Sequence, residues 1–131
     1  MLSKTSLQIV KALVELARLP ADQWEGVASI AKRTHAPQNY LGKVLQWLCS
    51  EGLVESQKGF GGGFRLARPA QKISLFNIVE PIEGVSRWGG CFLGKARCSD
   101  TAPCAIHRRW AAVREAYLEF LKATTLADLM K

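Results

Sequence analysis

Residues 26–68 carry two helix patterns followed directly by two strand patterns, and this order constrains the fold more than any other feature of the chain. GVASIAKRTH (26–35) reads as a short helix, and APQNYLGKVLQWLCSEGLV (36–54) repeats its leucines and valines at the helical period, with Pro37 at the first helical position and Gly52 just beyond the end. LVESQK (53–58) and FRLAR (64–68) read as strands around the tip GFGGG (59–63). A tight helix pair followed by a hairpin predicts a winged helix-turn-helix.

Further helix patterns flank this motif. KTSLQIVKALVELAR (4–18) predicts an amphipathic helix whose apolar face comprises Leu7, Val10, Leu13, Val14 and Ala17. KISLFNIVEPIEG (72–84) predicts a helix with Ser74 as its N-cap, Pro81 as a kink or stop, and Gly84 as its terminator. RRWAAVREAYLEFLKATTLADLMK (108–131) predicts one long last helix.

The last helix carries an apolar stripe that a small domain cannot easily cover. Trp110, Val113, Tyr117 and Phe120 step by three, four and three residues, as in a coiled coil. We expect this stripe to form a homodimer, which would present two recognition helices about one DNA turn apart; packing within the monomer is the alternative. The predicted fold is mainly α with a small β-hairpin wing. One structural domain comprises the winged helix (1–84), a cysteine-rich loop (85–107) and the dimerisation helix and tail (108–131).

Charge and hydropathy narrow the partners. Lys and Arg total 18 against 11 for Asp and Glu, a net charge of +7, which favours nucleic acid or a membrane surface. No apolar run approaches the roughly 20 residues that cross a bilayer, and the N-terminus lacks the apolar region and cleavage site of a signal peptide. We therefore expect a cytoplasmic protein with reduced thiols and no membrane partner.

Double-stranded DNA is the partner that the helix pair, the hairpin and the net charge together predict. The first turns of the 37–50 helix would enter the major groove, and wing glycines would let the backbone approach the minor groove or phosphates. The predicted DNA contacts are Gln38, Asn39, Tyr40, Lys43, Lys58, Phe60, Gly61 and Arg65. The alternatives are that these are solvated residues of a structural scaffold, or that the module docks onto proteins.

Three of the four cysteines and one of the two histidines lie in CFLGKARCSDTAPCAIHRRW (91–110). Cys91, Cys98, Cys104 and His107 are separated by six, five and two residues, and the Gly, Ser, Asp and Pro between them predict a loop on which all four could meet one metal centre. Paired ligands of structural zinc are closer in sequence, whereas thiolates with an imidazole suit an iron–sulfur cluster. Zinc, free reactive thiols and a Cys–His nucleophile remain alternatives; no third catalytic group is evident, so we expect no enzyme.

The sequence resembles the Rrf2 family of bacterial winged-helix transcription regulators along essentially its whole length. The resemblance rests on MLSKT at the start, NYL and EGLVES around the recognition helix, KGFGGGFRL in the wing, IVEPIEG, and the three cysteines before the last helix. It implies a dimeric DNA-binding regulator, with repressors among the possibilities, whose cluster reports iron, cluster supply, redox state or nitric oxide.

The resemblance also implies a ligand set. Cys91, Cys98 and Cys104 match the three family cysteines, and His107 matches the fourth ligand of IscR-like members, which favours [2Fe–2S] over [4Fe–4S]. NsrR-like members use an acidic residue of the partner subunit where this chain has Gln8, a poor iron ligand. The first cysteine gap is one residue longer than in IscR-like members. Lys58 and Phe60 stand where Arg and Pro are frequent, and Cys49 replaces a basic residue, so DNA sequence preference is not transferred.

Overall fold

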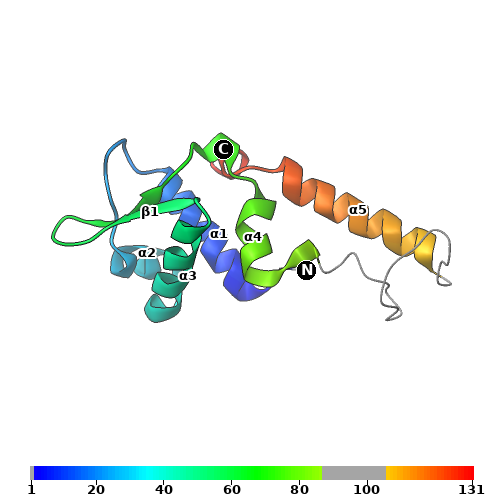
Figure 1. Cartoon of the computed structure of the whole chain (residues 1–131), viewed down its shortest axis with the longest axis horizontal. Helices are drawn as coiled ribbons and strands as arrows, with labels where there is room; N and C mark the ends of the chain where they lie inside the picture. The colour runs from blue at the N-terminus through cyan, green and yellow to red at the C-terminus, as the bar shows by residue number, and fades with distance from the viewer. Residues whose placement is uncertain (1, 87–105) are drawn as a thin grey trace.

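The computed structural model describes residues 2–86 and 106–131 and consists mostly of helices, with one antiparallel hairpin. The predicted fold class, a mainly helical winged helix-turn-helix with a small β-hairpin, is confirmed. Figure 1 shows the elements in chain order: α1 (Lys4–Ala17), α2 (Val27–Thr34), α3 (Gln38–Ser50), β1 (Val54–Gln57), β2 (Gly63–Leu66), η1 (Ala70–Lys72), α4 (Leu75–Glu83), α5 (His107–Ala123) and α6 (Leu126–Leu129). In this part of the chain, none of the helices is long and apolar enough to span a membrane.

The core lies between α1, α2, α3 and α4. The four predicted core residues of α3, Leu41, Val44, Leu45 and Leu48, are all buried. The predicted face of α1 was partly wrong, because Leu7 is 46% exposed. The buried face of α1 is rotated and comprises Ser6, Ile9, Val10, Ala12, Leu13 and Leu16.

The recognition helix begins one residue later than expected. Pro37 has an extended backbone (φ −62°, ψ 122°) and acts as the N-cap of α3, so it is not the first helical residue. Its carbonyl still accepts the first helical hydrogen bond, from the N–H of Leu41 at 2.9 Å. At the other end, Gly52 has a φ of 78° and continues the chain out of the helix as predicted.

The hairpin pairs Val54 with Leu66 and Gln57 with Gly63. An additional bridge joins Glu25, before α2, to Phe64 of β2. Gly63 makes this close approach possible, since a Cβ there would lie 2.3 Å from the Glu25 carbonyl oxygen. The wing is therefore attached to the segment that leads into the helix pair.

Helix α4 has the predicted caps. Ser74 and Asn77 form a reciprocal capping box, with 3.0 Å between each donor and acceptor, and Gly84 ends the helix in the left-handed region. Pro81 lies inside the helix, which continues to Glu83.

The last predicted helix is divided in two. Helix α5 ends at Ala123, and Thr125 caps the short α6, so the prediction of one continuous helix was wrong. The Leu75 N–H donates to the Thr124 carbonyl at 2.8 Å, and the Leu126 N–H to the Ile73 carbonyl at 2.9 Å, which fixes this break against α4. From there α5 extends away from the rest of the protein (Figure 1). Among its 17 residues only Leu121 is buried.

Candidate nucleic-acid interface

The turn between α2 and α3 holds the recognition helix in position. His35 ends α2 in the left-handed region, with φ 56° and ψ 35°. Its carbonyl accepts a hydrogen bond from Gln8 Nε2 at 3.1 Å, which connects α1 to this turn. The buried Thr34 hydroxyl donates to the Ile30 carbonyl at 2.9 Å. These contacts set the angle at which α3 leaves the turn.

One side of α3 forms an open groove with α2 and the wing. We call it the α3 groove; its lining residues are Val27, Gln38, Asn39, Gly42, Lys43, Gln46 and Phe64. Three predicted contacts of α3, Gln38, Asn39 and Lys43, therefore share one surface. Tyr40, the fourth, is 42% exposed but does not line the groove.

Sequence reasoning missed Gln46 in this groove. It lies one turn after Gly42 and Lys43, so helical spacing from those two residues was the signal that could have found it. Gly42 allows no exceptional approach within the protein, since a Cβ there would make an ordinary 3.7 Å contact with Val27 Cγ2.

The N-terminus of α3 is polar and open. No side chain caps it within the described structure, and Gln38, Asn39 and Tyr40 in its first turn are exposed. The free N–H groups and the positive end of the helix dipole favour an anion such as a DNA phosphate at this end.

The wing places its predicted contacts at an exposed tip. Lys58, Phe60 and Gly61 are all exposed. Figure 1 shows the hairpin projecting from the body on the same side as α2 and α3. Wing tip and α3 groove can therefore face one extended ligand.

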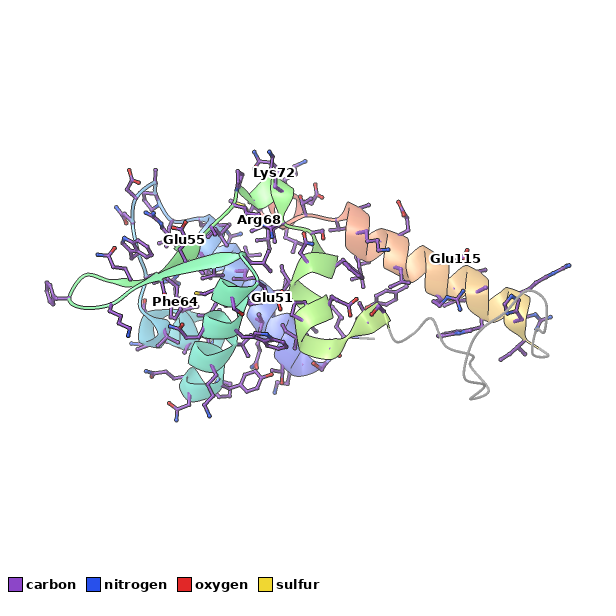
Figure 2. All side chains as sticks on the ribbon, viewed as in Figure 1. Glu51, Glu55, Phe64, Arg68, Lys72 and Glu115 are labelled. Carbon is purple, nitrogen blue, oxygen red and sulfur yellow. The ribbon has the colours of Figure 1, made fainter. Side chains whose placement is uncertain are left out.

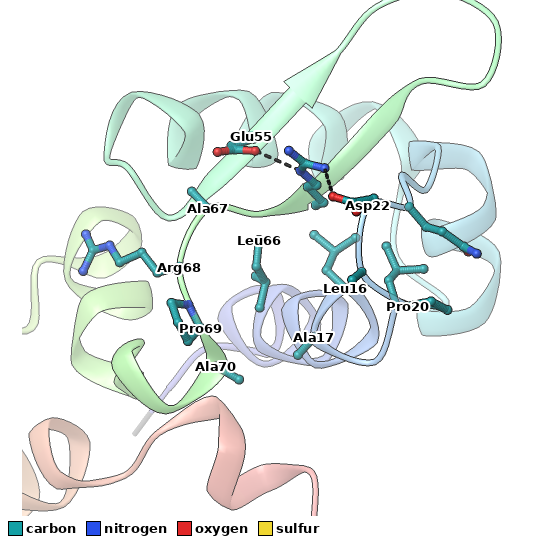
Figure 3. Close-up of a pocket in the computed structure, with 14 residues that line it drawn as sticks. Leu16, Ala17, Pro20, Asp22, Glu55, Leu66, Ala67, Arg68, Pro69 and Ala70 are labelled. Atoms are coloured by element: carbon teal, nitrogen blue, oxygen red, sulfur yellow. Dashed lines mark hydrogen bonds and ion pairs between the residues drawn. The ribbon is translucent and has the colours of Figure 1, made fainter.

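Arg65 lies on the other face of the hairpin. Phe64 lines the α3 groove, and the next side chain on a strand points to the opposite face. Arg65 Nε donates to Glu55 Oε2 at 2.9 Å, and its Nη1 is 3.8 Å from Asp22 Oδ1 (Figure 3). Its guanidinium also lies 4.1 Å from the centroid of the Trp24 ring. Two carboxylates and a ring thus hold Arg65 at the base of the wing, beside the hollow of Figure 3 that Leu16, Leu66 and Pro69 also line.

Charged side chains also connect α2 to the segment before it and to α1. Arg33 on α2 forms hydrogen bonds to both carboxylate oxygens of Glu25, and Ser29 donates to the same carboxylate at 2.9 Å. Arg33 Nε also contacts Glu15 Oε2 at 3.2 Å. The hydrogen bonds from Arg33 lower the pKa of the Glu25 carboxyl against the opposing effect of its burial, and Glu25 in turn raises the pKa of Arg33.

Of the predicted metal ligands, Cys91, Cys98 and Cys104 lie outside the described residues. His107 is half-buried and is the first residue of α5. Over residues 2–86 and 106–131, no group of three or more His, Cys, Asp or Glu side chains could hold a metal ion. Cys49 is a partly buried residue of α3 that packs against the core.

Comparisons with known proteins agree with this fold. The sequence model of the Rrf2 family, described as "Iron-dependent Transcriptional regulator", matches residues 2–131. A protein of Aquifex aeolicus named as an HTH-type transcriptional regulator is 36% identical over 123 residues, which cover 91% of this chain and 85% of that protein.

Two solved structures extend the comparison. CymR, the global cysteine regulator of B. subtilis, has a TM-score of 0.80 at 25% identity and covers 99% of this chain and 95% of its own. IscR of T. potens has a TM-score of 0.76 at 28% identity, covering 99% of this chain and 85% of its own.

Proposed function

The chain belongs to the Rrf2 family of iron-dependent transcriptional regulators, and we propose that it binds operator DNA as a homodimer and reports iron, redox state or nitric oxide through an iron–sulfur cluster. Members of this family are transcriptional regulators and not enzymes, and this chain is a DNA-binding transcriptional regulator. The α3 groove beside the projecting wing is the observation that carries the proposal.

The α3 groove would read bases and the wing would hold the adjacent backbone. Gln38 and Asn39 carry amides that can bond bidentately to adenine, and Lys43 suits guanine or a phosphate. Lys58 and the wing glycines would approach the neighbouring minor groove. Arg65 contributes less directly, because its carboxylate and ring contacts fix the base of the wing.

Helix α5 supports the homodimer. Val113 and Phe120, both in the predicted stripe, are 61% and 53% exposed. Tyr117 meets Phe120 edge to face at a centroid distance of 6.3 Å, so part of the stripe is already ordered as an aromatic surface. A second copy of the chain could cover this stripe with its own. The resulting two-fold dimer would match the two-fold symmetry of a typical operator.

The donor set and its position fit a cluster. Three cysteines and an imidazole are iron ligands, and the segment that carries them begins after the fully buried Val85 and ends at His107 on α5. We assign Cys91, Cys98, Cys104 and His107 as ligands, with [2Fe–2S] favoured over [4Fe–4S] and zinc as the weaker alternative. A bound cluster would supply iron that exchanges electrons or ligands with the signal.

A change at the cluster would reach the DNA-binding surface through the segment that carries the ligands. The segment that carries the cluster ligands joins the winged helix to α5. A change in the conformation of this segment would therefore shift the two recognition helices of a dimer relative to each other. A differential stability of a few kcal/mol is enough to change DNA occupancy strongly.

A second function is a metal-free or zinc-stabilised regulator that acts through its thiols or docks onto a protein. The likeness to CymR, a cysteine regulator, favours the thiol form of this alternative. The two functions differ in whether the cysteines hold iron.

Anaerobic purification followed by an absorption spectrum and iron, sulfide and zinc analysis separates them. About two irons and two sulfides per chain would support [2Fe–2S], and about four of each [4Fe–4S]. Zinc alone, or no metal after reconstitution, would favour the second function. Cys98→Ala should lose the cluster and change DNA affinity. Cys49→Ala should retain the cluster and the wild-type DNA affinity, because Cys49 packs against the core.

His107 has its own matched control. His107→Ala should lower cluster retention, and His35→Asn should not, because His35 is an exposed left-handed residue and Asn tolerates that conformation. Equal cluster content in His107→Ala and the parent would remove His107 from the ligand set.

A further inference from the structure

The tip of the wing presents a single large apolar side chain to solvent. Phe60 is 109% exposed, relative to its reference area, while the next most exposed large hydrophobic among the described residues, Val113, is 61% exposed. The turn on either side of Phe60 is also open, since a Cβ added at Gly59 or Gly61 would meet nothing within 4 Å. Phe60 therefore contributes nothing to the core of the protomer.

A tight turn holds Phe60 in this exposed position. The Gly62 N–H donates to the Gly59 carbonyl at 3.1 Å, closing a four-residue turn. Gly61 has a φ of 80°, the value of about +80° that a type II turn requires at its third residue. Phe60 is thus the second residue of the turn, at its outer corner.

The turn is packed closely onto the hairpin that carries it. A Cβ at Gly62 would lie 2.1 Å from the Gln57 carbonyl oxygen, so only glycine allows this approach. Farther back, the bridge between Phe64 and Glu25 anchors β2 to the helix pair. The hairpin therefore holds the Phe60 ring at its tip on a firm support.

We propose that Phe60 is an apolar wedge that enters the minor groove of bound DNA, partly unstacks one base step and bends the duplex. The proposal rests on the proposed function, because it requires α3 to occupy the adjacent major groove. Apolar side chains that enter the minor groove act in this way in architectural DNA-binding proteins. Lys58, two residues before Phe60, supplies a charge for the flanking phosphates.

The surroundings of Phe60 favour DNA over a protein partner. A stable protein interface needs about 800 Å² from each side, whereas one ring among glycines offers a small fraction of that area. The hairpin continues the α3 groove, since Phe64 of β2 lines it, and the chain carries a net charge of +7. A wedge needs only one ring on a stiff support beside an anion-binding surface.

The wedge also predicts how sites are chosen. Pyrimidine–purine steps unstack most easily, so operators should carry such a step beneath the wing although no side chain there reads its base edges. Selectivity at that step would come from the energy of deforming the DNA.

The test uses duplexes recovered by in vitro selection with the wild-type protein in its cluster-loaded and cluster-free forms. The bend is measured by energy transfer between dyes at the duplex ends, and unstacking by 2-aminopurine at each position in turn. Wild-type protein should bend the duplex and brighten one position beneath the wing. Phe60→Ala should abolish both signals and weaken binding by roughly ten- to a hundredfold, the effect of leaving one large apolar side chain unburied.

Two variants make the result specific. Phe60→Leu keeps an apolar wedge and should keep most of the bend, whereas Lys58→Ala should weaken binding without removing the bend. Thermal unfolding of Phe60→Ala should match the wild type, because the ring is outside the core.

Three outcomes would count against the wedge. If Phe60→Ala bends and unstacks the duplex like the wild type, there is no wedge, and unchanged affinity as well would point to a protein partner at the tip. If Lys58→Ala alone removes the bend, the bending comes from phosphate neutralisation. Recovery of no duplex by the wild-type protein would overturn the proposed function itself, and the wedge with it.

Discussion

Glu25 and Phe64 exchange two backbone hydrogen bonds, 3.0 Å from the Glu25 N–H to the Phe64 carbonyl and 2.8 Å from the Phe64 N–H to the Glu25 carbonyl. The same glutamate binds Arg33 of α2 through its carboxylate. One residue therefore joins the wing to the helix pair through its backbone and its side chain. The relative placement of α3 groove and wing tip depends on this junction.

Gly63→Ala should disrupt the junction. Gly63 has a φ of 141°, and a Cβ at this position would lie 2.3 Å from the Glu25 carbonyl oxygen. In the variant, β2 must therefore move away from the segment that precedes α2. We expect the free energy of unfolding to fall by at least about 2 kcal/mol, measured by urea titration. Gly26→Ala is the control, because Gly26 has a φ of −72° and open space around its Cβ position. Equal stability of the two variants would show that the wing tolerates displacement.

Glu25→Gln should destabilise the protein in a pH-dependent way. Hydrogen bonds from Arg33 hold the pKa of Glu25 below its ordinary value, so the carboxylate stabilises the fold above the pKa of the unfolded chain and loses this effect as pH falls through the folded pKa. With Arg33 43% exposed, we expect a loss of about 1 kcal/mol at neutral pH. The gap between variant and wild type should close in acid.

Denaturant titrations at several pH values measure that gap. Glu119→Gln, at an exposed position of α5, should show no such trend. A gap for Glu25→Gln that stays constant from neutral pH into acid would mean that the ion pair contributes nothing to stability.

Local sequence rules predicted the elements that local interactions determine. The caps Ser74 and Gly84, the core residues of α3 and the hairpin around its glycines all follow from short-range periodicity and turn chemistry. The same reasoning failed for Leu7, because heptad-like spacing alone does not say which of two apolar faces meets the core. It also missed the break at Thr124, which depends on hydrogen bonds with the distant Ile73 and Leu75.

In the candidate site, too, the features set by local interactions could be predicted and those set by distant residues could not. The exposed positions of Gln38, Asn39 and Lys43 could be predicted from the helix pattern, and the structure brings the three residues into the α3 groove. That they contact DNA stays a prediction. The ion pair between Arg65 and Asp22 could not be predicted, because Asp22 precedes Arg65 by roughly 40 residues, which is beyond the range of local sequence patterns. The cysteine ligands remain predictions from their spacing and from the family.

Lys58→Ala should weaken DNA binding and reduce its salt dependence. Removing one phosphate contact lowers the slope of log affinity against log salt by about 0.9. Lys72→Ala removes the same charge from η1, which Figure 2 shows on another side of the protein from the hairpin tip. Fluorescence anisotropy over a range of salt concentrations should show the smaller slope for Lys58→Ala alone. A slope equal to that of Lys72→Ala would exclude Lys58 from the phosphate contacts.

Val113→Lys should dissociate the homodimer. Val113 is 61% exposed in the protomer, so the lysine is tolerated in the monomer but buries an unpaired charge when two α5 helices meet. We expect at least about tenfold weaker association, measured by sedimentation velocity, and a matching loss of affinity for a two-half-site operator. Glu115→Gln changes the net charge by the same amount at a position about 200° around the helix from Val113, and its association should equal that of the wild type. Unchanged association in both variants would show that the exposed face of α5 is not where the copies meet, and would leave this stripe available to another partner.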